Sequence, residues 1–222
     1  MMSDIMTGTN LTVIRDGNRL IDNISLSVPR GQITMVLGHN GAGKTILIRT
    51  LHNLITADDG IVSGPAHHDQ KMVFQKPILL RRSVREHFDF VCPGLDEAKA
   101  LEWLDKAGLS NFATRYCHSL SGGEQQKLAL IGALASAPKL LFLDEPTAHL
   151  DIESTVFIED MITAARQSGM SIVMISHSRS QAERLAEHVA FLEAGKLLEM
   201  TTAERFFTAS KNAAVKRFLA HI

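Results

Sequence analysis

The chain has 222 residues, of which 45% are hydrophobic and 21% are charged, and its formal net charge is −1. This length and apolar content suffice for one α/β domain with a continuous core. The near-neutral charge excludes a general basic field of the kind that attracts nucleic acid, so we expect no nucleic-acid partner. The two cysteines, Cys92 and Cys117, are too few for a disulfide framework and are typical of reduced thiols in a cytosolic protein.

The start of the chain, residues 1–10, has no basic segment followed by an apolar stretch, so we expect no secretory signal. The longest weakly polar run, residues 128–138, falls well short of the roughly 20 residues that a membrane-spanning helix needs. We therefore expect a chain that does not cross a membrane by itself. The sequence contains no internal repeat and no low-complexity segment.

The first third of the chain predicts a hairpin, a buried strand and a helix, in that order. Apolar residues recur at strand spacing over residues 11–28, where Asp16-Gly17-Asn18 supplies a turn, and we expect an antiparallel β-subdomain there. Residues 33–37 form a continuous apolar run, which is typical of a strand buried on both faces. Residues 45–54 repeat at helical period.

The middle of the chain is mostly helical. A turn-rich stretch, residues 57–70, precedes a strand expected at residues 71–75. From residue 77 to 119 the pattern becomes helical, and residues 95–109 carry apolar side chains at the i, i+3, i+4, i+7 spacing. Pro93-Gly94 is expected to separate two of these helices.

The last third alternates buried strands with helices. Strands are expected at residues 140–143 and 172–175, each followed by a helix. A short strand pair is expected over residues 189–198 with a turn at Ala194-Gly195, and one amphipathic helix over residues 203–222. The alternation of strands and helices predicts an α/β fold.

A glycine-rich segment, GHNGAGKT from Gly38 to Thr45, lies between the expected strand and the helix after it. It matches the pattern G-x-x-x-x-G-K-[ST], in which glycines let backbone amides surround a phosphate group. We expect Lys44 to bridge the β- and γ-phosphates of a nucleotide and Thr45 to ligate Mg²⁺. An ordinary glycine-rich turn is the alternative, which the flanking strand and helix disfavour. The expected nucleotide-binding residues are Gly38, His39, Asn40, Gly41, Ala42, Gly43, Lys44, Thr45 and Ile46.

Two adjacent acids end the expected strand LLFLDEP, Leu140 to Pro146. Their side chains point in different directions because side chains alternate along a strand. Asp144 is expected to hold the Mg²⁺ shell, and Glu145 to orient and deprotonate an attacking water. Taken alone, such a pair is commonplace in a solvated loop or helix cap. The phosphate loop about a hundred residues upstream gives the pair its specificity.

The run LSGGE, Leu120 to Glu124, presents a serine hydroxyl and two glycine amides before a long helical segment, residues 125–137. A helix start of this kind can bind a γ-phosphate through its amides and its dipole. Taken alone, the same residues favour an ordinary serine-capped helix.

Read in chain order, these three segments resemble the ATP-binding subunit of an ATP-binding-cassette (ABC) transporter. The resemblance covers about residues 9–220 and implies a P-loop NTPase core with an antiparallel β-subdomain and a small helical subdomain. Within a single domain, residues 1–222, the core would comprise residues 9–76 and 119–222, and the helical subdomain residues 77–118. The implied activity is hydrolysis of ATP, with ATP and Mg²⁺ bound.

The resemblance also implies a second copy of the chain. In this family the LSGGE segment completes the ATP site of the other protomer, so Ser121, Gly122 and Gly123 would serve a partner's nucleotide in a head-to-tail homodimer. Asp151 matches an aspartate that crosses the dimer interface. Its alternative is a simple N-cap for the helix that starts near Ile152.

Two further residues match family positions. Gln75 corresponds to the glutamine that touches Mg²⁺ and water and joins the core to the helical subdomain. His177 corresponds to the histidine that contacts the γ-phosphate and holds Glu145. Taken alone, Gln75 would be read as a surface residue and His177 as a structural histidine at a strand end. The other nine histidines show no spacing that indicates a metal site.

The chain departs from the family at the expected adenine contact. An aromatic residue normally stands 23 positions before the first glycine of the phosphate loop, and here that position is Arg15. Arg15 either stacks on adenine through its guanidinium plane or faces solvent. Ala148-His149 and Gly132 also differ from common family residues, but none of these changes removes a catalytic atom.

The segment VFQKPILLRRSV, residues 73–84, most resembles ATPases of oxyanion importers, tungstate first and phosphate and molybdate next. The implied partners are an integral membrane permease and, indirectly, a substrate-binding protein. The chain would then lie at the cytoplasmic face of the inner membrane, held there by the permease. Arg81 and Arg82 are expected near the surface that receives the permease, although either one alone would be read as part of a solvated turn.

Two other functions are open to the same motifs. A soluble ABC ATPase that serves cofactor assembly or another non-transport system would share all of them, although such proteins usually carry coiled-coil insertions or extra domains. The other is a P-loop kinase or a nucleotide-dependent binding module, of which the kinase would need an acceptor site and would lack LSGGE.

Overall fold

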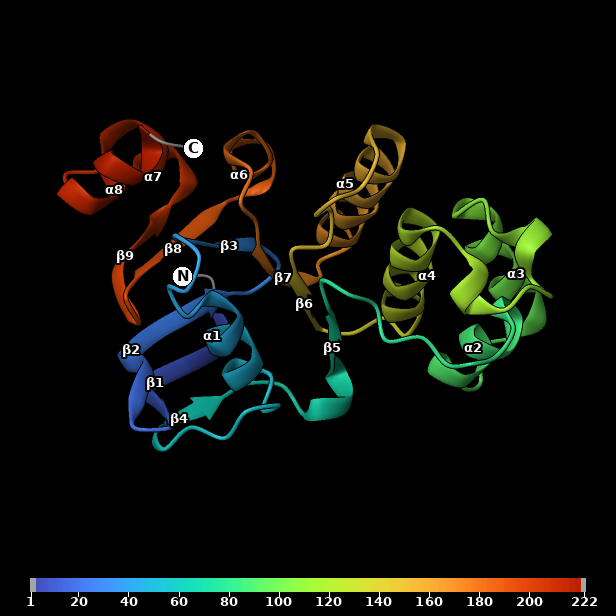
Figure 1. The fold of residues 1–222 in the computed structure, drawn as a ribbon, viewed down its shortest axis with the longest axis horizontal. Helices are drawn as coiled ribbons and strands as arrows, with labels where there is room; N and C mark the ends of the chain where they lie inside the picture. Colours follow the sequence, from blue (N-terminus) through green and yellow to red (C-terminus); the bar gives the residue numbers. More distant parts are fainter. Residues whose placement is uncertain (1–2, 221–222) are drawn as a thin grey trace.

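The computed structural model describes residues 3–220, and its centre is a six-stranded sheet in the order β5-β6-β7-β3-β8-β9 (Figure 1). Its first five strands in that order are parallel, and β9 pairs with β8 in the antiparallel sense. Every residue of β3, β6 and β7 is buried, as the continuous apolar runs predict. The strands are β3 (Ile33–Leu37), β5 (Gln70–Val73), β6 (Leu140–Asp144), β7 (Ser171–Ile175), β8 (His188–Glu193) and β9 (Lys196–Thr202).

A second, antiparallel sheet contains β1 (Asp4–Arg15), β2 (Asn18–Pro29) and β4 (Asp59–Ser63), in the order β2-β1-β4. The predicted hairpin is present, but its first strand begins seven residues earlier than Leu11. The strand β4 lies in the stretch that the sequence predicts as turns. Its residues alternate between exposed and half-buried and include Gly60, so its apolar pattern is too weak to indicate a strand.

Helices cover the two faces of the main sheet differently. Helix α1 (Lys44–Leu51) packs with β1 and β2 on one face, where it meets Leu140 and Phe142. The opposite face, with Leu141 and Leu143, packs against α4 (Gly122–Ala135), α5 (Ile152–Gln167), α6 (Arg179–Leu185) and the C-terminal helices. Successive side chains of β6 therefore enter different clusters, as the alternation of a strand requires.

Two helices project beyond the β5 edge of the sheet (Figure 1). They are α2 (Val84–Val91) and α3 (Glu97–Lys106), and Pro93-Gly94 lies in the break between them, as predicted. Ser83 and Glu86 form a capping box at the start of α2. Buried residues of both helices pack against α4, which also contributes to the core under the sheet. The boundaries of a helical subdomain at residues 77 and 118 stay a prediction.

The end of the chain differs from the single helix predicted over residues 203–222. The structure has two short helices, α7 (Ala203–Ala209) and α8 (Ala213–Leu219), and residues 221–222 lie outside the described part. Ser210 donates to Glu199 at 2.6 Å, and Asn212 caps α8 by accepting from the Ala214 amide. Ser210 Oγ also accepts from the Asn212 amide at 3.2 Å. The side chains of Ser210 and Asn212 thus bind backbone amides that a continuous helix would bond to its own carbonyl groups, and this explains the break.

Within residues 3–220, none of the helices combines the length and the apolar content that a membrane span requires.

Candidate functional site

The phosphate loop joins the end of β3 to the start of α1 and needs its glycines. A Cβ atom on Gly38, whose φ is +148°, would overlap the carbonyl oxygen of Leu192. A Cβ atom on Gly43, at φ +98°, would lie 2.7 Å from the carbonyl oxygen of Leu20. Gly41, at φ +77°, has open space in front of it. The loop is thus closed against the protein on one side and open on the other, which suits a cradle for phosphate.

Lys44 lies at the base of this loop and is only 6% exposed. Its Nζ donates to the carbonyl oxygens of Gly38 at 2.8 Å and His39 at 2.9 Å. Burial lowers the pKa of Lys44 below its ordinary value, against the opposing attraction of Glu145 and Asp144. The terminal amino group is therefore held inside the loop and beside the pocket, where a phosphate group would meet it.

Asp144, the last residue of β6, lies against the start of α1. Thr45 Oγ1 donates to Asp144 Oδ1 at 3.1 Å, and Arg49 Nη2 lies 3.6 Å from Asp144 Oδ2. Burial raises the pKa of Asp144, and the hydrogen bond from Thr45 opposes this effect. The carboxylate and hydroxyl oxygens are ligands that Mg²⁺ prefers, so the residues present fit this ion. Sequence reasoning did not identify Arg49, because no motif includes its position.

Glu145 follows Asp144 and adopts a left-handed backbone conformation with φ +50°. Gln75 Nε2 donates to Glu145 Oε2 at 3.0 Å, and His177 Nε2 lies 2.5 Å from Glu145 Oε1. Gln75 follows β5 and His177 follows β7, while β6, which precedes Glu145, lies between these two strands. Because the carboxyl ends of parallel strands meet at one edge of the sheet, three residues far apart in sequence converge there.

A buried glutamine, Gln181 of α6, forms hydrogen bonds to the segments that follow β6 and β7 at this edge of the sheet. Its Oε1 accepts from Ser176 Oγ at 2.7 Å, and its Nε2 donates to Thr147 Oγ1 and to Glu159 Oε1, each at 2.9 Å. Ser176 precedes His177, and Thr147 lies two residues after Glu145. Gln181 therefore joins the segments that carry the two facing side chains. The sequence gives no signal for this residue, because its partners come from three separate segments.

The LSGGE segment forms the start of α4, which begins at Gly122 and not after the glycines as expected. Ser121 and Glu124 form a capping box, so the local interpretation as a serine-capped helix holds. Nothing lies within 4 Å of a Cβ atom built on Gly122, whereas one built on Gly123 would overlap Ser154 Oγ. Asp151 caps α5 by accepting from the Ser154 amide at 2.7 Å.

A pocket of about 580 Å³ opens in front of the phosphate loop. Glu145 and His177 line it from the sheet edge, and Arg19, Leu20 and the turn Ala194-Gly195 line it from the β-sheets. Within residues 3–220, the lining includes neither Arg15 nor the LSGGE residues. The pocket thus brings together the phosphate loop and the acidic strand end.

Arg15 lies outside this lining and contacts the loop after α1. It donates to Asp58 Oδ2 at 3.0 Å through Nη1 and to the carbonyl oxygen of Thr56 at 3.3 Å through Nη2. About half of its side chain is exposed. The terminal nitrogens of the Arg15 guanidinium group therefore bind groups of the protein itself. Contact of Arg15 with adenine stays a prediction.

Comparisons with known proteins identify the family of this chain. The ABC transporter family matches residues 21–148. The chain is 38% identical to the tungstate uptake system ATP-binding protein TupC of Peptoclostridium acidaminophilum, over 91% of this chain and 99% of that protein. It is 33% identical to the phosphate import ATP-binding protein PstB 2 of Natronomonas pharaonis, over 92% and 82% of the two chains.

A third relative is named for the transport of a different solute. The chain is 32% identical to the glutamate transport ATP-binding protein GluA of Corynebacterium glutamicum, over 91% of this chain and 92% of that protein. Among solved structures, an ATP-binding subunit of an ABC transporter superimposes with a TM-score of 0.86 at 20% identity, covering 96% of this chain and 99% of that one. These findings confirm the α/β fold of the P-loop NTPase type. The chain belongs to the ABC transporter family, and it is an ATP-binding subunit of the ABC ATPase type, in which ATP hydrolysis is coupled to transport.

Proposed function

We propose that this chain binds Mg-ATP in the pocket before the phosphate loop and hydrolyses it to power solute import through a separate membrane permease. The observation that carries the proposal is the arrangement around Glu145, whose two carboxylate oxygens each have one partner, Gln75 and His177. A fixed carboxylate at this edge can orient a water molecule and accept its proton. Lys44 would hold the β- and γ-phosphates.

The residues present fit both expected groups. Gly41 leaves the phosphate side of the loop open, and the start of α1 supplies backbone amides for an anion. Thr45 and Asp144 offer oxygen ligands side by side, with Gln75 within reach of the same acidic pair. When bound, Mg²⁺ would neutralise negative charge on the phosphate oxygens. The chain's own residues then position the nucleotide and the water.

We also propose that the active form is a head-to-tail homodimer. Ser121 and Gly122 are exposed, and they do not line the pocket of their own chain within the described residues. Their open surface at the start of α4 is suited to a γ-phosphate that arrives from outside. Asp151 at the start of α5 is exposed beside it and would take part in the same interface.

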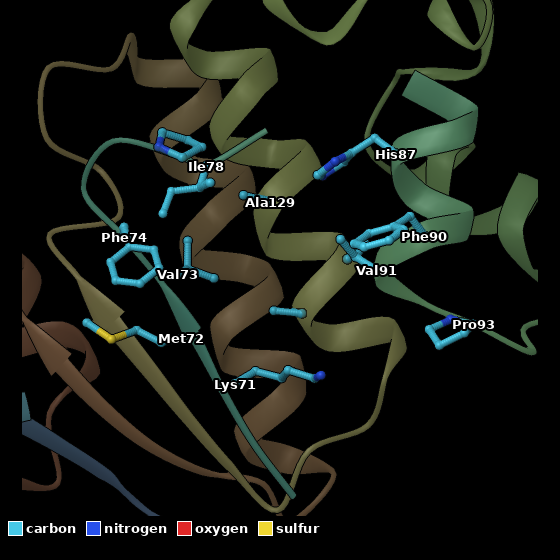
Figure 2. A pocket seen from close by; sticks show the side chains of 13 residues that line it. Lys71, Met72, Val73, Phe74, Ile78, His87, Phe90, Val91, Pro93 and Ala129 are labelled. Carbon is cyan, nitrogen blue, oxygen red and sulfur yellow. The ribbon is translucent and has the colours of Figure 1, made fainter. Parts of the chain in front are cut away.

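The permease is proposed to dock in a groove between β5 and the projecting helices. This groove, of about 420 Å³, is lined by side chains of β5, α2 and α4, and Figure 2 shows Phe90 and Val91 across it from Phe74. Ile78 and Phe90 are 75% and 62% exposed, which is costly for apolar side chains without a partner. Arg81 and Arg82, three and four residues after Ile78 in the chain, are exposed. Docking here would hold the chain at the cytoplasmic face of the inner membrane and connect the permease to Gln75.

The proposed cargo is an oxyanion, with tungstate as the first candidate. Support comes from the resemblance of residues 73–84 and from the relatives named for tungstate and phosphate. A relative named for glutamate transport matches over a similar length. The relatives therefore support a transport function more strongly than they support an oxyanion as the transported solute.

The test is to co-purify the chain with its permease and to measure Mg-ATP turnover with binding proteins loaded with tungstate, molybdate, phosphate or glutamate. We expect the tungstate-loaded protein to stimulate turnover most. Equal stimulation by all four would overturn the oxyanion assignment. Turnover that survives Glu145→Gln would overturn the catalytic assignment itself.

A further inference from the structure

Both chain neighbours of His177, the side chain that meets Glu145, are held by one residue of α6, Gln181. Ser176 Oγ donates to Gln181 Oε1 at 2.7 Å. Ser178 Oγ accepts from the backbone amide of Gln181 at 3.3 Å, as the cap of α6. Ser176 Oγ also accepts from the Ser178 amide at 3.0 Å. The backbone of His177 is therefore fixed on both sides, and this limits the directions in which its ring can point.

The loop that follows Glu145 is strained and is held by the same residue. Glu145 and His149 both adopt left-handed backbone conformations, at φ +50° and +62°. Residues other than glycine keep such conformations only where the surrounding structure holds them. Thr147 lies between the two, and Gln181 Nε2 donates to Thr147 Oγ1 at 2.9 Å. Within the described part of the chain, this pair makes the only side-chain hydrogen bonds of residues 146–150.

The orientation of the Gln181 amide is fixed by a carboxylate of α5. Gln181 Nε2 also donates to Glu159 Oε1 at 2.9 Å, and Arg184 Nη2 donates to the same oxygen at 2.8 Å. The amide nitrogen has to face this carboxylate, because the amide oxygen has no proton to donate. The amide oxygen therefore faces Ser176. Since Gln181 is only 2% exposed, solvent offers its amide no alternative partners.

The amide lies where the pairing of the two strands stops. Among residues 3–220, the ladder between β6 and β7 ends at the pair Asp144 and Ile175. The two facing side chains come from the next residue of the first strand and from the second residue after the other strand. Strand pairing therefore does not set their separation. The bridge from Ser176 through the amide to Thr147 spans the two segments instead.

We propose that Gln181 is a positioning residue for hydrolysis, whose side-chain amide sets the separation of Glu145 and His177. The inference rests on the proposed hydrolytic function and adds to it a residue that does not belong to the pocket lining formed by residues 3–220. A misplacement of reacting groups by about 1 Å can lower a rate by about 10²-fold. Gln181 thus governs the hydrolytic step, whereas nucleotide affinity depends on the phosphate loop. A merely structural role would change stability and leave kcat of the folded chain as it is.

The experiment measures Mg-ATP turnover of Gln181→Leu in complex with the permease, and ATP binding to the isolated chain by calorimetry, at a temperature where circular dichroism shows both chains folded. We expect kcat to fall by about 10- to 100-fold and the ATP affinity to stay within about two-fold. Val28→Ala, at a fully buried position near the end of β2, destabilises the chain by a cavity and should keep the native kcat. An unchanged kcat in Gln181→Leu, or an equal loss in Val28→Ala, would overturn the inference.

A pair of variants at Thr147 repeats the test without changing Gln181. Thr147→Val keeps the shape of the side chain but removes the hydroxyl group that binds the amide, so kcat should fall as it does in Gln181→Leu. Thr147→Ser keeps the hydroxyl group and should retain kcat within about three-fold. Equal kcat values in the two variants would contradict the inference. If Gln181→Leu does not fold, this pair decides the question.

A double-variant cycle shows whether Gln181 acts through His177. His177→Ala removes one of the two groups whose separation is set, so adding Gln181→Leu should lower kcat by less than about three-fold. If the losses of the two single variants multiply instead, Gln181 acts independently of His177 and the inference is wrong. Turnover that survives Glu145→Gln, or a native complex without turnover, would refute the proposed function itself.

Discussion

Oε1 of Glu145 lies 2.5 Å from Nε2 of His177, across the ends of two neighbouring parallel strands. Gln75 binds the other carboxylate oxygen, so the group is held from both sides. This placement requires a left-handed backbone conformation of Glu145 at φ +50°. Such a conformation costs a non-glycine residue of order 1–3 kcal/mol. Strain of this kind persists where the surrounding structure fixes the residue, and here it aims the carboxylate into the pocket.

The first prediction concerns this carboxylate. Glu145→Gln keeps the shape of the side chain but removes its ability to accept a proton, so kcat should fall by roughly 10²–10⁴-fold with little change in ATP affinity. Steady-state turnover and calorimetric binding measure the two quantities separately. Glu153→Gln makes the same change at a side chain that is 93% exposed, and it should leave both quantities as they are. Equal turnover in Glu145→Gln and the native chain would contradict the assignment of the base.

A second prediction concerns Gln181, which is 2% exposed and joins Ser176 to Thr147. Gln181→Leu keeps similar volume but leaves two hydroxyl groups and an oxygen of Glu159 without this partner. We expect the free energy of unfolding to fall by about 2–4 kcal/mol, because each buried group left unsatisfied costs about 1–3 kcal/mol. Urea denaturation measures the change. Gln167→Leu, at an exposed position on α5, is the matched control, and equal loss in both variants would refute the role of the network.

Much of the central sheet could be predicted because its strands are buried on both faces. The runs in β6 and β7, residues 140–143 and 172–175, are apolar throughout, and the run in β3 is interrupted only by Thr34. A continuous apolar run of this kind is a strong local signal. The candidate site residues Asp144, Glu145 and His177 follow such runs, so their place at the sheet edge could be predicted with the strands. The contact between Glu145 and His177 depends on the order of the strands, and here the family resemblance supplied what the local pattern lacks.

Other features depend on partners that a local pattern does not contain. Strand β4 is stabilised by pairing with β1, and its own five residues alternate too weakly to indicate it. The contacts of Arg15 with Asp58 join segments 43 residues apart. The break between α7 and α8 follows from a hydrogen bond of Ser210 to β9, which overrides the helical period of the sequence.

The two glycines of the LSGGE segment give a third prediction. Gly123→Ala would place a methyl group onto Ser154 Oγ and near the carboxylate of Asp151, so the starts of α4 and α5 would have to separate. Overpacking of this kind costs about 1–3 kcal/mol, and thermal unfolding should show a lower Tm. Gly122→Ala introduces the same methyl group into open space and should not lower the Tm.

The variants Gly122→Ala and Gly123→Ala also distinguish an effect on folding stability from an effect on assembly of the dimer. If Gly122 faces the nucleotide of a partner protomer, Gly122→Ala should lower ATP turnover several-fold while the chain keeps its stability. Turnover and ATP-dependent dimerisation, measured by light scattering on the Glu145→Gln background, provide the readout. Full activity in Gly122→Ala would contradict the proposal that this surface completes a second ATP site.

The last prediction starts from His52, which is 6% exposed at the end of α1. Its ring contacts His67 and Phe142 at centroid distances of 4.8 and 5.4 Å, and within the described residues neither ring nitrogen has a hydrogen-bond partner. Burial, together with the nearby charges of His67 and Lys71, lowers the pKa of His52 to about 4.

A histidine with a lowered pKa in the folded state stabilises the protein only while it is neutral. Its contribution is complete above pH 6.5, and it is lost as the pH falls from 6.5 to about 4, because the unfolded chain binds the proton more readily in this range. We expect the free energy of unfolding to fall by about 2 kcal/mol between pH 7.5 and pH 5 from this residue alone. His52→Leu should remove that part of the loss, whereas His118→Leu, at an exposed position, should not. Urea denaturation at pH 7.5, 6 and 5 measures the difference, and parallel pH profiles of native chain and His52→Leu would show that another group causes the acid sensitivity.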